Sequence, residues 1–171
     1  KGEFASVRLP AGTGKEDEEN GRLVLAKPQT FMNLSGETVA GFAVYFKILL
    51  PDILVVVDDV ALPLGVLRLR RGGSDGGHNG LKDVSLRLGS HFYPRLRVGV
   101  GGREEGEPRV AEDLVGHVLS RFSAAEEQLL QGRLALAADA CLCWVHDGLE
   151  AAMNKYNARD KQTLEQERKG E

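Results

Sequence analysis

Apolar and polar positions divide the chain into short strands and helices that follow one another. Two stretches of strand composition, Phe4 to Leu9 and Arg22 to Ala26, flank the charged segment GTGKEDEEN, which predicts a hairpin with a solvated turn and not an acidic site. Apolar residues then recur at three- and four-residue spacing and predict a helix from about Ser35 to Phe46; they are Val39, Phe42, Ala43 and Phe46.

The middle of the chain continues the same alternation. The segment ILVVVDDV, from Ile53, is a continuous β-branched run typical of a strand buried on both faces in the middle of a mostly parallel sheet. In VLRLR, which ends at Arg70, leucines alternate with arginines, so we expect a strand with one basic face. A glycine-rich loop, a helix from about Asn79 to Leu88 and a strand in RLRVGVGG come next.

The last third of the chain is helical in pattern. Ser123 and Glu126 form a capping box before a long helix that reaches about His146, and Gly148 separates a short helix that ends near Asn157. Residues 158–171 carry almost no apolar side chain and are expected to be a disordered polar tail. We therefore predict an α/β fold: one three-layer domain over residues 1–157, with a mixed, mostly parallel central sheet flanked by helices.

Composition limits the classes of function. The chain has 171 residues, 42% of them hydrophobic, with a formal charge of −3 and a pI near 5.9. These values fit one soluble domain and argue against nucleic-acid binding through bulk positive charge, so an anionic partner needs a local basic patch. No run is apolar enough to cross a bilayer and the first residues lack a signal-peptide core, so we expect an intracellular protein. Cys141 and Cys143 point in different directions from one helix, so we expect no disulfide between them.

Two polar clusters lie at element ends, where α/β folds build sites. In FMNLSG, Asn33 or Ser35 is a candidate helix cap; alternatively, the Asn33 amide orients a carbonyl or a ribose hydroxyl beside the apolar face of Phe31. Asp58 and Asp59 follow the buried run ILVVV, where adjacent carboxylates need a cationic or hydrogen-bonding partner. They either form a turn before Pro63 or include a carboxylate that orients a catalytic histidine.

The glycine-rich segment RGGSDGGHNGLKD, from Arg71 to Asp83, admits several interpretations. Free N–H groups before a helix suggest an anion cradle, but the segment matches neither phosphate-loop pattern and Asp75 would oppose an anion. The glycines otherwise form a structural turn, with Asn79 as a helix cap and His78 as an exposed loop residue. A concentration of basic residues surrounds this segment and offers either solvated faces or a phosphate-binding surface; it comprises Arg68, Arg70, Arg71, Lys82, Arg87, Arg95 and Arg97.

Four motifs in order, KPQTFMNLSG, ILVVVDDVALPLG, GGHNGLKD and PRLRVGVG, together with the closing VHDGLEAAMNKYN, resemble bacterial-type peptidyl-tRNA hydrolase over roughly Gly21 to Asn157. This resemblance implies a monomeric α/β enzyme, without metal or cofactor, that hydrolyses the ester between a peptide or N-blocked amino acid and the 3′ ribose of tRNA. It implies a cytoplasmic protein, unless a transit peptide in a preceding segment directs it to an organelle.

The resemblance also assigns roles by motif. Asn33 and Asn79 are expected to hold the 3′ end of the substrate and position the ester and a water, and Asp58 to keep a catalytic histidine basic and oriented. Phe31 is expected to support the terminal nucleotide or the peptide. Contacts to tRNA phosphates are expected from the basic positions of the motifs, namely Arg68, Arg70, Lys82 and Arg97.

One departure from the family pattern concerns the base. In this family it is a histidine on an N-terminal segment, after a GLGNPG-like turn, and neither feature exists here. His91, His117 and His146 match no catalytic position, and His78 matches a loop residue. Because the chain begins at Lys1 as if a strand were under way, we expect that an N-terminal segment is missing and that these residues alone are inactive.

Two rival functions remain. A non-catalytic RNA-binding relative on the same scaffold would not require Asn33, Asp58 and Asn79 together, so their presence favours the enzyme. A nucleotide-phosphate enzyme that uses the glycine loop would need the lysine motif that the loop lacks.

Overall fold

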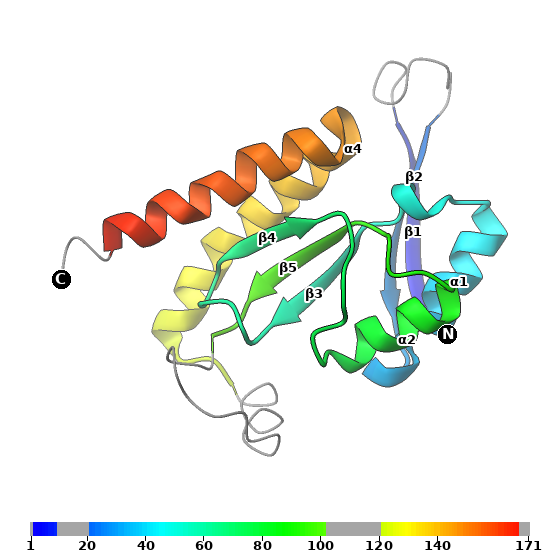
Figure 1. Cartoon of the computed structure of the whole chain (residues 1–171), viewed down its shortest axis with the longest axis horizontal. Helices are drawn as coiled ribbons and strands as arrows, with labels where there is room; N and C mark the ends of the chain where they lie inside the picture. The colour runs from blue at the N-terminus through cyan, green and yellow to red at the C-terminus, as the bar shows by residue number, and fades with distance from the viewer. Residues whose placement is uncertain (1, 10–20, 102–120, 168–171) are drawn as a thin grey trace. The chain divides into compact units, whose positions relative to one another are not determined.

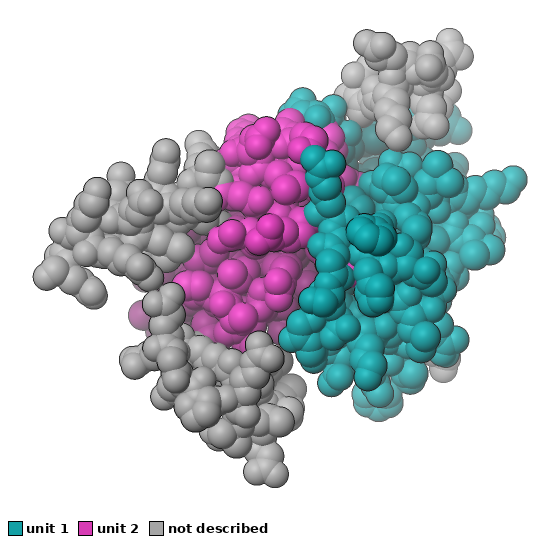
Figure 2. All heavy atoms as spheres, in the orientation of Figure 1, with its two compact units in different colours: residues 1–54, 71–94, 145–147 teal, residues 55–70, 95–144, 148–171 magenta. Residues whose placement is uncertain are grey.

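The structure is a computed structural model that describes residues 2–9, 21–101 and 121–167. Its contacts divide the chain into two compact units, shown in different colours in Figure 2. Unit 1 comprises Lys1–Leu54, Arg71–Pro94 and Val145–Asp147, and unit 2 comprises Val55–Arg70, Arg95–Trp144 and Gly148–Glu171. One domain over residues 1–157 stays a prediction.

Unit 1 begins with the predicted hairpin (Figure 1). Strands β1 (Gly2–Arg8) and β2 (Arg22–Pro28) pair antiparallel, with Gly2 opposite Pro28 at one end and Arg8 opposite Arg22 at the other. Phe4 of β1 packs against α1 (Ser35–Phe46), with its ring 5.2 Å from that of Phe42 and 6.0 Å from that of Phe46. The connecting segment GTGKEDEEN lies outside the described residues.

Helix α1 packs against α2 (Asn79–Leu88), and both helices have the predicted bounds. Short 3-10 helices, η1 (Met32–Leu34) and η2 (Leu50–Asp52), stand on either side of α1 in the chain. Helix α2 ends at Gly89, whose φ of 64° is the left-handed conformation that glycine adopts at helix ends. Helix α1 ends at Lys47, which is also left-handed with φ 56°.

Unit 2 contains a three-stranded sheet in the order β3 (Val55–Asp59), β5 (Arg95–Gly99), β4 (Leu67–Arg70). Strand β3 runs parallel to β5 and β4 runs antiparallel, which confirms an α/β fold with a mixed sheet. Among the described strand pairs, β1 with β2 included, only β3 with β5 is parallel, so parallel pairing is not in the majority there.

The expected central position of the ILVVV strand is wrong for the described sheet. Strand β5 has a neighbour on each side, whereas β3 has one, and Val56 of β3 is 52% exposed. Composition indicates how apolar a strand is, but pairing partners distant in the sequence decide which strand lies in the middle. Strand β4 behaves as predicted, with Leu67 and Leu69 fully buried and its arginines on the more open face.

Helix α4 (Ala124–Glu167) begins at the predicted capping box. The carboxylate of Glu126 accepts the backbone N–H of Ser123 at 2.7 Å, and the Ser123 hydroxyl accepts the N–H of Glu126 at 3.4 Å. Gly148 interrupts the helix with φ 82° and ψ 174°, which confirms the predicted separation.

The helix continues to Glu167, so a disordered tail from residue 158 is wrong up to that point. The stretch ARDKQTLEQE consists mostly of strong helix formers, which extend a helix that has already begun. Residues 168–171 lie outside the described part.

Two further expectations concern the helices. Cys141 and Cys143 are free thiols, and burial raises the pKa of Cys141. Within the described ranges, no helix combines the length and the apolar character that crossing a membrane requires.

Candidate active site

The FMN and GHNG segments meet in unit 1. η1 packs against α2 where Met32 covers Gly80, and a Cβ atom at residue 80 would lie 2.5 Å from the sulfur of Met32. Glycine at this position therefore allows the close approach. Asn33 and Asn79 each stand one residue from this contact, so the fold brings the two predicted amides onto neighbouring turns.

Neither amide serves as a helix cap. The N-cap residue of α1 is Leu34, which provides no side-chain hydrogen bond, and Asn33 lies before it in η1. Asn79 is the first residue of α2, whose cap is His78. The interpretation of Asn33, Ser35 or Asn79 as a cap is wrong, and both amides are exposed. Phe31, two residues before Asn33, is 81% exposed.

His78 caps α2 through its ring. Its Nδ1 accepts the backbone N–H of Leu81 at 3.1 Å. While this cap is in place, the lone pair of Nδ1 is not free to take a proton from water. His78 is a half-buried capping residue and is poorly suited to act as a general base.

The glycine-rich segment before His78 forms a backbone turn. Gly76 and Gly77 have φ values of 63° and 87°, and the Asp75 carboxylate accepts the Gly77 N–H at 2.9 Å. This hydrogen bond lowers the pKa of Asp75 and keeps a negative charge inside the turn. The geometry favours the structural turn over the anion cradle.

The two aspartates of β3 have different surroundings in unit 2. Asp59 is 6% exposed, accepts the Ala61 N–H at 3.0 Å and lies 2.8 Å from the Nε of Arg97. Its Oδ2 contacts Arg97 as an ion pair, without the alignment of a hydrogen bond. Asp58 is half-buried, and because side chains alternate along a strand it belongs to the opposite face of the sheet.

The predicted phosphate contacts differ in how they are placed. Arg68 of β4 stands directly opposite Arg97 of β5, and Arg70 is exposed at the end of β4. Like charges opposite each other on a sheet repel, and Asp59 offsets this repulsion on the Arg97 side. Lys82 is exposed on α2 of unit 1. Arg97 is thus partly committed to Asp59, a pairing that the sequence did not reveal.

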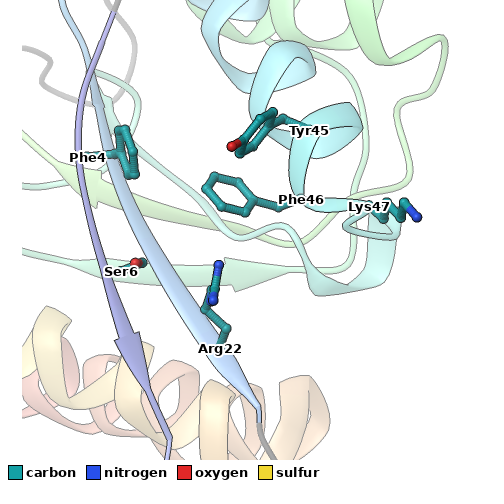
Figure 3. A pocket seen from close by; sticks show the side chains of 6 residues that line it. All are labelled: Phe4, Ser6, Arg22, Tyr45, Phe46 and Lys47. Carbon is teal, nitrogen blue, oxygen red and sulfur yellow. The ribbon is translucent and has the colours of Figure 1, made fainter.

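A shallow hollow of about 490 Å³ elsewhere in unit 1 contains none of the predicted site residues (Figure 3). Three aromatic side chains and three basic or hydroxyl side chains, from the hairpin and the end of α1, surround it: Phe4, Tyr45, Phe46, Arg22, Lys47 and Ser6. Within the described residues, no three histidine, cysteine or carboxylate side chains are grouped so that they could hold a metal ion.

Two polar residues with clear structural roles escaped the sequence analysis. Asp83 of α2 accepts the Gly36 N–H at the start of α1, at 2.7 Å. The Asn157 amide forms two hydrogen bonds with the backbone of Leu69, one in each direction, at 2.8 and 3.1 Å. The partners are 47 and 88 residues away in the sequence, so no local pattern indicated either role.

Comparisons with known proteins show the family of this chain. The family model described as peptidyl-tRNA hydrolase matches residues 3–165, nearly the whole chain. The chain belongs to the peptidyl-tRNA hydrolase family. This match begins at residue 3, so it does not support the expectation that an N-terminal segment is missing.

Individual relatives show how closely the chain resembles other peptidyl-tRNA hydrolases. A protein of that name from Synechococcus sp. (strain JA-2-3B'a(2-13)) is 46% identical over 153 residues, which is 90% of this chain and 66% of that protein. One from Clostridium botulinum (strain Hall) is 44% identical over 138 residues, 81% of this chain and 69% of that protein. The chain thus spans slightly less than two thirds of the length of the Synechococcus relative.

Solved structures agree with the fold. The crystal structure of peptidyl-tRNA hydrolase from Acinetobacter baumannii matches with a TM-score of 0.73 and 33% sequence identity. The match covers 90% of this chain and 71% of that one. At this identity and coverage, the two chains share the fold.

Proposed function

We propose that this protein hydrolyses the ester that joins a peptide, or an N-blocked amino acid, to the 3′ ribose of tRNA. The observation that carries the proposal is the packing of η1 on α2, which places the exposed amides of Asn33 and Asn79 on neighbouring turns in a member of the peptidyl-tRNA hydrolase family. The relatives reported above are named as hydrolases, which favours the enzyme over a non-catalytic RNA-binding relative.

The proposed reaction is an attack of water on the ester carbonyl. A base removes one proton of the water as its oxygen bonds to the carbonyl carbon; the C–O bond to the ribose then breaks, and the ribose oxygen leaves as a hydroxyl after it takes up that proton. The N–H groups of Asn33 and Asn79 orient the ester and stabilise the negative charge that develops on the carbonyl oxygen. Asp58 orients the histidine that acts as the base and stabilises its positive charge after it has taken the proton.

No histidine in the described residues is placed as that base. His78 uses Nδ1 as a helix cap, His91 and His146 match no catalytic position, and His117 lies outside the described part of the chain. We therefore expect little or no hydrolysis by these 171 residues alone, and an external base should replace the histidine.

Substrate binding in this proposal also depends on one aromatic and four basic side chains. Phe31 stacks on the terminal nucleotide or contacts the peptide, and tRNA phosphates are held by the exposed Arg70 and Lys82 with help from Arg68 and Arg97. The proposal includes a monomer that acts in the cytoplasm and uses no metal or cofactor.

Chemical rescue tests the proposal. We expect the chain to bind an N-acetylated aminoacyl-tRNA and to release its amino acid slowly, with a rate that rises with added imidazole beyond the rate without protein. Substitution of Asn33→Ala or Asn79→Ala should reduce the imidazole-dependent rate by about 10²-fold, the effect of losing one oxyanion donor. Asn154→Ala, an exposed asparagine on α4, is the matched control and should have no effect.

Two results would contradict parts of this scheme. Absence of both tRNA binding and imidazole-dependent hydrolysis would refute the proposed function. Rapid hydrolysis without imidazole would support the function but refute the expectation that these residues lack a base.

A further inference from the structure

The first turn of α1 has a hydrogen-bond partner on another helix. The first N–H groups of a helix have no partner within it, and Leu34 at the N-cap provides none. The Asp83 carboxylate of α2 fills this role by accepting the Gly36 N–H at 2.7 Å. A carboxylate there also interacts favourably with the positive end of the α1 dipole.

The surroundings of Asp83 hold its carboxylate in place. Its side chain is only 11% exposed, and its second oxygen, Oδ1, lies 3.7 Å from the Nε of Arg87. Arg87 also pairs with Glu37 in the first turn of α1, at 3.0 Å. At Gly36 the backbone carbonyl of Asp83 occupies the space that a Cβ atom would need, so the two helices approach each other closely at this point.

Asn33 lies between two residues that contact α2. Met32, one residue before it, packs on Gly80, and Gly36, three residues after it, is bonded to Asp83. Both partners are on the first turns of α2, and Asp83 is four residues from Asn79, on the same side of that helix. A shift at the Gly36 to Asp83 bond would therefore move Asn33 relative to Asn79.

We infer that Asp83 is a positioning residue that sets the separation of the Asn33 and Asn79 amides. This inference rests on the proposed function, in which the two amides act on one ester. An amide displaced by about 1 Å can cost about 10²-fold in rate, although Asp83 itself contacts no reacting atom. We call the hydrogen bond between the Asp83 carboxylate and the Gly36 N–H the clamp. Loss of the clamp should lower kcat more than it changes KM, because the binding contacts to tRNA remain.

Substitutions at Asp83 test the inference. Asp83→Ala removes the bond to Gly36 and should lower the imidazole-dependent kcat by about 10- to 100-fold, with KM changed less than about threefold. Asp83→Asn keeps an oxygen that can accept the Gly36 N–H, so it should restore most of the rate. Glu37→Gln is the matched control. It removes a negative charge from the first turn of α1, next to Gly36, but leaves the bond between Gly36 and Asp83 intact.

A second readout does not depend on catalysis. In ¹⁵N spectra, Asp83→Ala should shift the Gly36 backbone amide and the side-chain amides of Asn33 and Asn79, whereas Glu37→Gln should leave the two asparagine amides in place. If Asp83→Ala does not fold, Asp83→Glu carries the test, because the longer side chain keeps the charge but cannot accept the same N–H without displacing the helix.

The outcomes separate the two ideas. Unchanged asparagine amide signals and unchanged kcat in a folded Asp83→Ala or Asp83→Glu protein would overturn the role of Asp83. Shifted amide signals in a chain that never hydrolyses the ester would support the clamp and count against the proposed function.

Discussion

His78 and Asn79 are adjacent, yet the structure gives them different tasks. The imidazole of His78 accepts a backbone N–H and ends the glycine turn, whereas the amide of Asn79 is exposed at the first position of α2. The histidine that attracts attention in GGHNG is therefore a structural residue. The asparagine beside it is a candidate for contact with substrate.

The cap predicts a specific loss of stability. His78→Ala should lower the free energy of unfolding by about 1 kcal/mol, because the Leu81 N–H loses its partner. His78→Asn should retain most of the stability, since asparagine is a strong N-cap. Urea denaturation of the three proteins measures the difference, and equal midpoints for His78→Ala and the unsubstituted chain would refute the cap.

Asp75 predicts a dependence on pH within the glycine turn. The Gly77 N–H lowers the pKa of the carboxyl, so the bond favours the folded turn above the ordinary aspartate pKa of about 3.9 and is lost as the pH falls through the lowered value. In an NMR titration, the Asp75 carboxyl should titrate below about 3.9, and the Gly77 amide signal should follow the same midpoint. A midpoint at or above the ordinary value would contradict this geometry.

At the scale of elements, glycines in one helix have opposite roles. A Cβ atom at Gly36 would collide with the backbone carbonyl of Asp83, whereas a Cβ at Gly41 would meet no atom within 4 Å. Both residues are in α1, so helix propensity alone treats them alike. Packing against α2 distinguishes them.

This contrast gives a paired prediction. Gly36→Ala should destabilise the chain by about 1 to 3 kcal/mol through overpacking, and Gly41→Ala should stabilise it by about 0.5 to 1 kcal/mol through helix propensity. Denaturant unfolding measures both. Stabilisation by Gly36→Ala would mean that α1 and α2 are not in close contact at this position.

The Asn157 amide joins α4 to the sheet of unit 2. Strand β4 is at one edge of the described sheet, and Asn157 pairs with the N–H and the carbonyl of Leu69, which is fully buried. Asn157→Ala should lower the free energy of unfolding by about 1 to 3 kcal/mol, because two buried backbone groups lose their partners. The exposed Asn154 on the same helix provides the control, and an equal effect of Asn154→Ala would contradict the role of Asn157.

At the scale of the whole molecule, a formal charge of −3 coexists with a local set of cations. Binding of tRNA should then depend on salt through those cations and not through total charge. Arg70→Ala and Lys82→Ala should each weaken binding of deacylated tRNA and reduce the slope of log K against log salt by about 1. Arg97→Ala should also destabilise unit 2, because Asp59 would lose its ion pair.

Fluorescence titrations of tRNA at several salt concentrations measure these slopes, and urea denaturation measures the stability of the Arg97→Ala protein. Slopes that do not change in Arg70→Ala and Lys82→Ala would exclude both residues as contacts to tRNA phosphates.

The sequence by itself determined features that depend on neighbours a few residues apart. Apolar spacing predicted α1, alternation predicted β4, and Ser123 with Glu126 predicted the start of α4. The order of the motifs indicated the family that the comparisons then showed. Each of these features is encoded locally, because helix caps, side-chain periodicity and motifs involve short stretches of chain.

Only the tertiary structure decided the contacts between distant residues. It placed β3 at an edge of the described sheet, paired Asp59 with Arg97, and capped α1 with an aspartate 47 residues away. From the local sequence of α1, Asn33 or Ser35 was predicted as that cap. The Asp83 carboxylate accepts the Gly36 N–H instead, because α1 packs against α2. A backbone N–H group forms a hydrogen bond with the acceptor that tertiary packing places next to it. A pattern over a few residues cannot predict that acceptor when it is far away in the sequence.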